Sequence, residues 1–220
     1  MKVITLIAVL FTMMLVSATA AADEFTEDDA EDMAFEQLDG EEQKAVLATL
    51  QKALDDSIEE AEDKIREDGQ MLPFGYALNA AGEGQFLRLD HEEGEIPAGQ
   101  AAQGIQRSIA ESAIAGNLVG SLLYVTMASP AEMGEMGEEL MAELDEELED
   151  ARMLLVEMQH LAGVGALTAV PYWQSEDEGA WVFGEPQQTQ VEPRLRQLVQ
   201  DYYRQRREAA EAGAAEADSE

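Results

Sequence analysis

Hydrophobic positions change their spacing several times along the chain, and each change predicts a different element. Across residues 41–67 apolar side chains recur every three or four positions and acids fill the other faces, which predicts an amphipathic helix. Asp39 is a candidate N-cap for this helix and Gly69 a candidate stop. From 70 to 90 the apolar residues alternate instead, with a glycine-containing turn at 79–84, so this stretch predicts a β-hairpin.

The middle of the chain returns to helical spacing. After a loop at 92–97, alanines and isoleucines three and four positions apart predict a second helix that ends near Gly116. Residues 118–127 are strongly apolar but too few for another long helix, and their Val, Tyr and Thr content favours a buried strand. Ser129 and Glu132 flank a proline in the manner of a capping box, so an acidic helix is expected to begin there.

The last third of the chain is predicted to hold strands and a closing helix. Apolar residues alternate again over 152–160, and glycine-containing turns separate this strand from two more, at 166–173 and 180–183. Pro171 must lie at a sheet edge or a bulge, because proline has no N–H to donate to a ladder. Pro193 is suited to the first turn of a final helix.

This order of elements predicts the fold class. Hairpin-like connections dominate, which indicates an α+β fold with one mostly antiparallel sheet of about five to six strands and flanking helices. No repeat or linker divides residues 37–207, so we expect a single domain that carries the acidic helical insertion at 130–150. The acidic stretches 21–36 and 208–220 are expected to be tails on either side of it.

Three short motifs carry a resemblance to known sequences. Pro73-Phe74-Gly75 lies on an early predicted strand, and Pro171-Tyr172-Trp173 and Phe183-Gly184-Glu185-Pro186 lie on late ones. With these motifs the chain resembles a group of uncharacterised bacterial α+β proteins, and the order of its elements resembles that of profilin-like and Roadblock-type sheets. The resemblance implies a topology and no particular activity.

The first 20 residues have the layout of a secretory signal peptide. Lys2 precedes an apolar run that ends at Val16, and small residues follow it. The run is shorter than the roughly 20 apolar residues that a membrane-spanning helix needs. We therefore expect cleavage after Ala20, with Ala22 as the alternative, and a secreted or periplasmic mature protein without a transmembrane segment.

Charge narrows the choice of partners. The chain has 47 acids against 13 bases, a formal net charge of -34, and binding to nucleic acid depends on cationic groups, so no nucleic-acid partner is expected. The acids concentrate in three tracts, with eight in 23–36, ten in 131–150 and five in 208–220. Either adaptation to a saline environment or a function of the acidic helix would explain them. The absence of cysteine excludes disulfides, thiolate catalysis and cysteine-ligated metals.

Catalytic signatures are missing from the sequence. It contains no nucleophile elbow, no zinc-binding His-Glu-x-x-His helix, no phosphate loop and no dinucleotide fingerprint, so no cofactor is expected. Histidine chemistry would have to use His91 or His160. His160 ends a predicted strand, where a hydrogen bond to the backbone and a role as the base of an unrecognised hydrolase are the two alternatives.

Metal binding is suggested by methionines and by the acidic tracts. Met133 and Met136 share a face of the predicted acidic helix and Met141 follows, and thioethers at such spacing suit Cu(I). Packing of the same methionines in a core is the alternative. The acidic tracts would also bind Ca²⁺ weakly, without a shaped site.

Aromatic residues and arginines are the candidate binding groups. Three aromatic residues on neighbouring predicted strands would make a recognition surface or pack in the core: Tyr172, Trp173 and Trp181. Three arginines on the final helix would meet an anionic partner or the chain's own acids: Arg204, Arg206 and Arg207.

These observations favour a secreted or periplasmic, non-enzymatic interaction or ligand-binding protein, with an envelope protein as the candidate partner. Periplasmic metal binding and hydrolysis are the alternatives.

Overall fold

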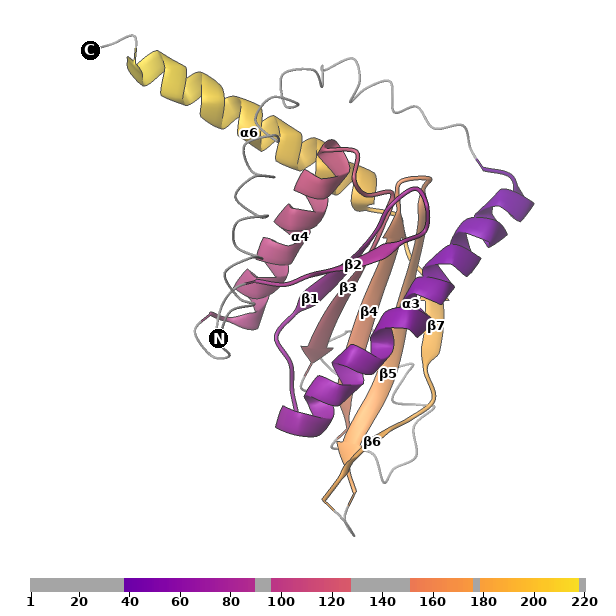
Figure 1. Ribbon diagram of the computed structural model, residues 1–220. Coiled ribbons are helices and arrows are strands. Elements are labelled where there is room, and N and C mark those ends of the chain that lie inside the picture. The colour runs from indigo at the N-terminus through magenta and orange to yellow at the C-terminus, as the bar shows by residue number, and fades with distance from the viewer. Residues whose placement is uncertain (1–37, 90–95, 128–150, 176–178, 218–220) are drawn as a thin grey trace, which may run out of the picture.

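The structure is a computed structural model that describes residues 38–89, 96–127, 151–175 and 179–217, with side chains described up to residue 209. Within these ranges one antiparallel sheet carries helices on both faces, which confirms the predicted α+β class (Figure 1). The predicted signal peptide, the acidic tail 21–36, and the acidic helix 130–150 with its methionines lie outside the described residues.

The sheet is built from hairpins and one helical crossover. Its main order is β2-β1-β3-β4-β5-β6, β7 also pairs with β5, and every pair is antiparallel. The strands are β1 Phe74–Leu78, β2 Gly84–Leu87, β3 Gly120–Met127, β4 Arg152–His160, β5 Val164–Gln174, β6 Trp181–Phe183 and β7 Gln187–Gln190.

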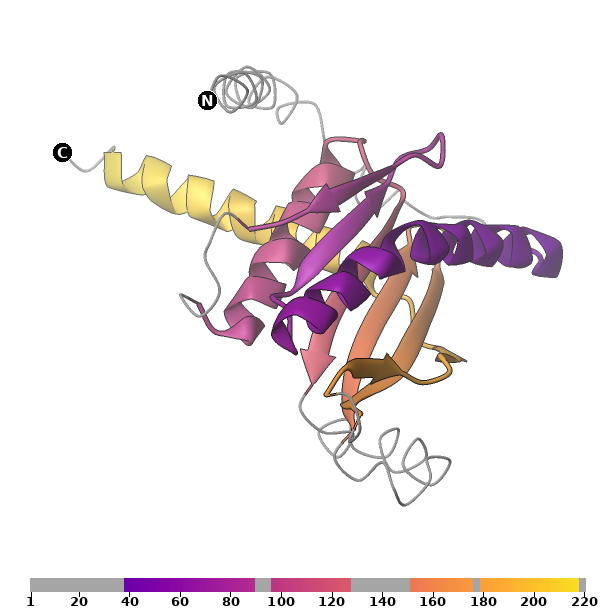
Figure 2. The ribbon, with the colours of Figure 1, turned by 60° about the horizontal axis from the view of Figure 1, so that its bottom comes forward.

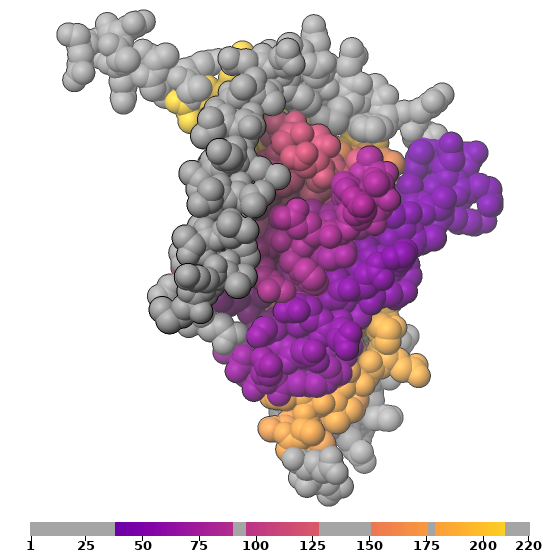
Figure 3. Space-filling model, in the orientation of Figure 1, coloured from indigo at the N-terminus to yellow at the C-terminus, as the bar shows by residue number. Residues whose placement is uncertain are grey.

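Helix α3, Gly40–Asp68, covers one face of this sheet (Figures 1 and 3). It begins at the N-cap expected at Asp39, whose side chain accepts from the N–H groups of Glu41 and Glu42 and forms a capping box with Glu42. It stops, as expected, at Gly69 in the left-handed conformation with φ 71°. Its buried stripe packs on alternate residues of β1, β3, β4 and β5, among them Tyr124 and Val156. This cluster is the main core of the described structure.

The other face carries α4, Ala98–Ile114, and the start of α6, Leu195–Ala217. Ile105 and Ile109 of α4 meet Leu195 and Val199 of α6 in a second, aliphatic cluster on the sheet. Beyond this contact α6 leads away from the sheet (Figure 2). It continues through residues that the sequence suggested as an acidic tail, because alanine and glutamate are strong helix formers.

Two details at the outer strands differ from what the sequence predicts. Strand β7 was not predicted, because all four of its residues are uncharged polar side chains with no alternation, and it forms by backbone pairing with Ala166–Ala169. Pro171 lies on β5 between the stretches paired with β7 and β6, where its carbonyl accepts from Gly184 N–H. Because β5 is paired on both sides, the edge position expected for Pro171 is wrong; its missing N–H faces the break between the two short outer strands instead.

None of the helices in the described ranges is long and apolar enough to cross a membrane.

Candidate functional site

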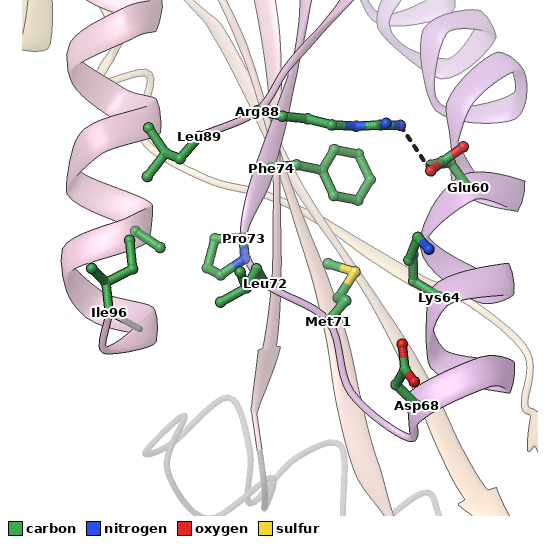
Figure 4. A pocket seen from close by; sticks show the side chains of 11 residues that line it. Glu60, Lys64, Asp68, Met71, Leu72, Pro73, Phe74, Arg88, Leu89 and Ile96 are labelled. Atoms are coloured by element: carbon green, nitrogen blue, oxygen red, sulfur yellow. Dashed lines mark ion pairs between the residues drawn. The ribbon is translucent and has the colours of Figure 1, made fainter. Parts of the chain in front are cut away.

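A pocket of about 250 Å³ opens where the C-terminal half of α3, the end of the β1–β2 hairpin and the start of α4 converge. Figure 4 shows it with α3 on one side and α4 on the other. Most of the lining is apolar and comes from the segment that leads into β1, the segment after β2, and the residues just before and in the first turn of α4: Met71, Leu72, Pro73, Phe74, Leu89, Ile96 and Ala101. Such a lining suits the apolar part of a small ligand.

Charged side chains form the rim of the pocket. Glu60, Lys64 and Asp68 follow one another at four-residue spacing, so they lie on one face of α3. Arg88, from the end of the hairpin, reaches across to Glu60, with 2.7 Å between its Nη2 and the carboxylate Oε1 (Figure 4). This ion pair links the hairpin to α3 above the apolar lining.

The other rim charges differ in how they are partnered. The Arg88 guanidinium also lies 4.9 Å from the centre of the Phe86 ring, a cation–π contact. Lys64 Nζ lies 3.0 Å from a carboxylate oxygen of Glu67, and this hydrogen-bonded contact raises the pKa of Lys64. The Asp68 carboxylate forms no hydrogen bond or ion pair with any residue that the structure describes.

The pocket floor is held in place by a buried aromatic stack. The Phe74 ring, which lines the pocket, stacks on Tyr124 at 4.4 Å between ring centres. The Tyr124 hydroxyl lies 2.6 Å from Ser57 Oγ, which itself donates to the Ala53 carbonyl, so Tyr124 is the donor of this pair. Burial raises the pKa of Tyr124 well above its ordinary value, which keeps that donor protonated.

A second cluster fixes the end of α3 beside the pocket. Arg152 Nη1 donates to the Gly69 carbonyl at 2.9 Å, and its guanidinium lies 5.3 Å from the centre of the Trp181 ring. A side chain on Gly69 would collide with that ring, since a Cβ there would lie 2.6 Å from Trp181. Trp181 therefore packs on the helix end, and Tyr172, 1% exposed, packs against Trp181.

The three candidate aromatic residues do not share one surface. In the β5–β6 ladder Tyr172 pairs with Phe183, and Trp173 pairs with Val182. Alternate residues point to opposite faces, so Tyr172 lies on the α3 face and Trp173 on the other. Trp173 is half-buried there beside Val182, which is 37% exposed.

The candidate arginines lie apart from these aromatic residues. Arg204, Arg206 and Arg207 are exposed on α6, beyond its contact with α4, and Arg204 forms an ion pair with Asp201 at 3.5 Å. The structure therefore does not bring the arginines and the tryptophans into one site.

His160 is a backbone-bonded histidine at the end of β4. Its Nδ1 accepts a hydrogen bond from the Ala162 N–H at 3.0 Å, and burial lowers its pKa, so both effects favour the neutral ring. Neither pocket described here includes His160.

The proposed metal ligands Met133, Met136 and Met141 lie outside the described residues. Within the described ranges no group of three or more histidine and carboxylate side chains is placed to hold a metal ion.

A second pocket of about 460 Å³ lies on the α4–α6 face, and the buried amide in its lining, Gln159, is bonded within the fold. The buried Gln159 donates to Glu157 through Nε2 at 3.0 Å and accepts from the Arg194 N–H through Oε1 at 2.8 Å. These bonds join the sheet to the start of α6, so the Gln159 side chain has its hydrogen-bond partners within the protein.

Sequence reasoning placed Phe74 on a strand but did not find the pocket. Glu60 and Arg88 come from separate elements, and nothing in their local spacing links them. The four-residue spacing of Glu60, Lys64 and Asp68 was the available signal, although it is also typical of any solvated helix face.

No family model matches this chain, and neither a curated protein nor a solved structure matches it. The resemblance carried by the three short motifs stays a prediction.

Proposed function

We propose that the chain is an exported, non-enzymatic binding protein that holds the apolar part of a small ligand in the pocket between α3 and α4. The observation that carries the proposal is the apolar pocket itself, bridged at its rim by the Glu60–Arg88 ion pair. A lining of this kind releases water from apolar surface when a ligand enters, which favours binding.

The chemistry of the lining supports binding over catalysis. The residues that line the pocket include no histidine, hydroxyl or thiol side chain, and their lysine and glutamate are held in ion pairs. The neutral, backbone-bonded His160 also gives no support to the hydrolase alternative.

Export rests on the sequence of residues 1–20. Expression of the full chain in a bacterial host, followed by mass spectrometry of the envelope and medium fractions, tests it. A mature protein that begins at Ala21 or Asp23 is expected, and an uncut chain confined to the cytoplasm would contradict export.

The binding proposal is tested with a series of straight-chain alcohols from propanol to octanol, followed by methyl NMR. The methyl signals of Met71, Leu72 and Leu89 should shift, because these residues line the pocket. Each added methylene should strengthen binding by up to about 0.8 kcal/mol until the pocket is full. Binding without such a chain-length limit would indicate a non-specific apolar surface and would contradict a shaped pocket.

Two glycines of α4 provide a matched pair of variants. A Cβ on Gly104 would lie 2.9 Å from Leu89 Cδ1, so Gly104→Ala must move a side chain that lines the pocket. Gly99 has nothing within 4 Å of that position. Gly104→Ala should change alcohol affinity and the chain-length limit, whereas Gly99→Ala should leave both at the wild-type values. Equal behaviour of the two variants would place the binding elsewhere.

A further inference from the structure

We infer that the pocket selects a cationic amphiphile, namely a small ligand with a short apolar body and a protonated amine. The inference rests on the proposed function and adds the charge of the ligand's polar end. It follows from which rim charges already have partners and which one does not.

The two cations of the rim are already engaged. Arg88 is held by Glu60 at 2.7 Å and lies over the Phe86 ring. Lys64 is held by Glu67 at 3.0 Å, although Asp68 and Glu60 also act on it through space. An anionic ligand would have to compete with these internal carboxylates for either cation.

Asp68 is the rim charge that has no direct partner among the described residues. Figure 4 shows its carboxylate beside Met71, at the edge of the apolar lining. A ligand whose apolar body fills the pocket can therefore place an ammonium group next to Asp68. Arg152 also approaches this helix end, but it is bound to the Gly69 carbonyl and lies over Trp181.

Two further features favour a cation at this position. Asp68 is the last residue of α3, and the carbonyl end of a helix carries partial negative charge. The formal net charge of -34 also raises the concentration of small cations near the protein surface. Both features attract a cation to this position, as the Asp68 carboxylate does.

The inference is tested with three probes that share one six-carbon chain: n-hexylammonium, 1-hexanol and hexanoate. Binding to the full mature chain is measured by methyl NMR at low salt. Hexylammonium should bind tightest and hexanoate weakest. Raising the salt concentration should narrow the difference, because partly exposed charges are screened.

Asp68→Asn and Glu59→Gln provide the matched comparison, since each removes one carboxylate from an exposed position on α3. Asp68→Asn should weaken hexylammonium binding roughly three- to five-fold, as expected for one partly exposed ion pair, and leave hexanol binding unchanged. Glu59→Gln should leave both unchanged. The fold should survive, because an acid at a helix C-terminus does not stabilise the helix.

The outcomes separate this inference from the proposed function. If hexanol binds in the pocket and hexylammonium binds no better, the pocket stands and the cation preference is wrong. The preference is also wrong if the two variants weaken hexylammonium binding equally, since that result reports net charge alone. If none of the three probes shifts the methyl signals of Met71 and Leu89, the proposed function itself fails.

Discussion

The two faces of the sheet are packed in different ways. The α3 face is aromatic: Phe74 stacks on Tyr124, and Arg152 and Trp181 fix the end of the helix. The α4–α6 face is aliphatic, and a glutamine joins the sheet to the start of α6. The aromatic packing supports a long helix across the sheet and also supplies the pocket floor, so the face with the larger core cluster holds the α3 side of the candidate site.

A matched pair of leucines should show the difference most strongly. Leu54 of α3 is 4% exposed and Leu195 of α6 is 2% exposed, so the same truncation tests both faces. Leu54→Ala should lower the global free energy of unfolding by about 3 kcal/mol, because it leaves a cavity in the main core. Leu195→Ala should release α6 locally instead, with a smaller global effect.

Urea denaturation and amide hydrogen exchange measure both effects. After Leu195→Ala, exchange should accelerate in α6 and remain slow in β3 and β4. Equal global losses without local release of α6 would show that the two faces unfold as one unit.

The hydrogen bond between Tyr124 and Ser57 should contribute a smaller amount. Tyr124→Phe removes the buried donor and should cost about 1 to 1.5 kcal/mol of unfolding free energy. A double-mutant cycle with Ser57→Ala isolates the pair, and a coupling near zero would show that the contact adds nothing beyond ring packing.

Thr168 should give a gain in stability. Its hydroxyl is buried and has no hydrogen-bond partner in the part of the chain that the structure describes, so Thr168→Val removes an uncompensated polar group and should stabilise the fold by about 1 kcal/mol. Thr189→Val, at an exposed position on β7, is the matched control and should change stability by less than about 0.5 kcal/mol. A loss of stability in Thr168→Val would mean that the hydroxyl does have a partner in solution.

Substitution of His160 should have the smallest effect on the free energy of unfolding, and this effect should be visible only when stability is measured as a function of pH. Burial lowers its pKa in the folded state below the ordinary value of 6.5, so the unfolded chain binds its proton more readily. The contribution to stability is therefore present above about pH 6.5 and is lost as the pH falls below that value. His160→Asn should flatten this part of the stability curve, and an unchanged curve would contradict the assignment.

The sequence predicted the elements better than the site. The period of the hydrophobic pattern predicted α3, the β1–β2 hairpin and α4, because local spacing determines which faces become buried. It missed β7, which has no hydrophobic period and forms through backbone pairing alone. Trp181 illustrates the same limit, since its contact with the end of α3 depends on tertiary packing that no local pattern encodes.

A titration of the mature protein with 1-hexanol tests the central claim most directly, because the pocket lining and the contact between α4 and α6 serve as each other's control in one experiment. Methyl signals of Met71, Leu72 and Leu89 should shift in a saturable way, while those of Leu195 and Val199 on the α4–α6 face should stay in place. Gly104→Ala should alter the titration and Gly99→Ala should reproduce that of the wild type. Shifts confined to Leu195 and Val199, or no saturable shift at all, would contradict a ligand pocket beside α3.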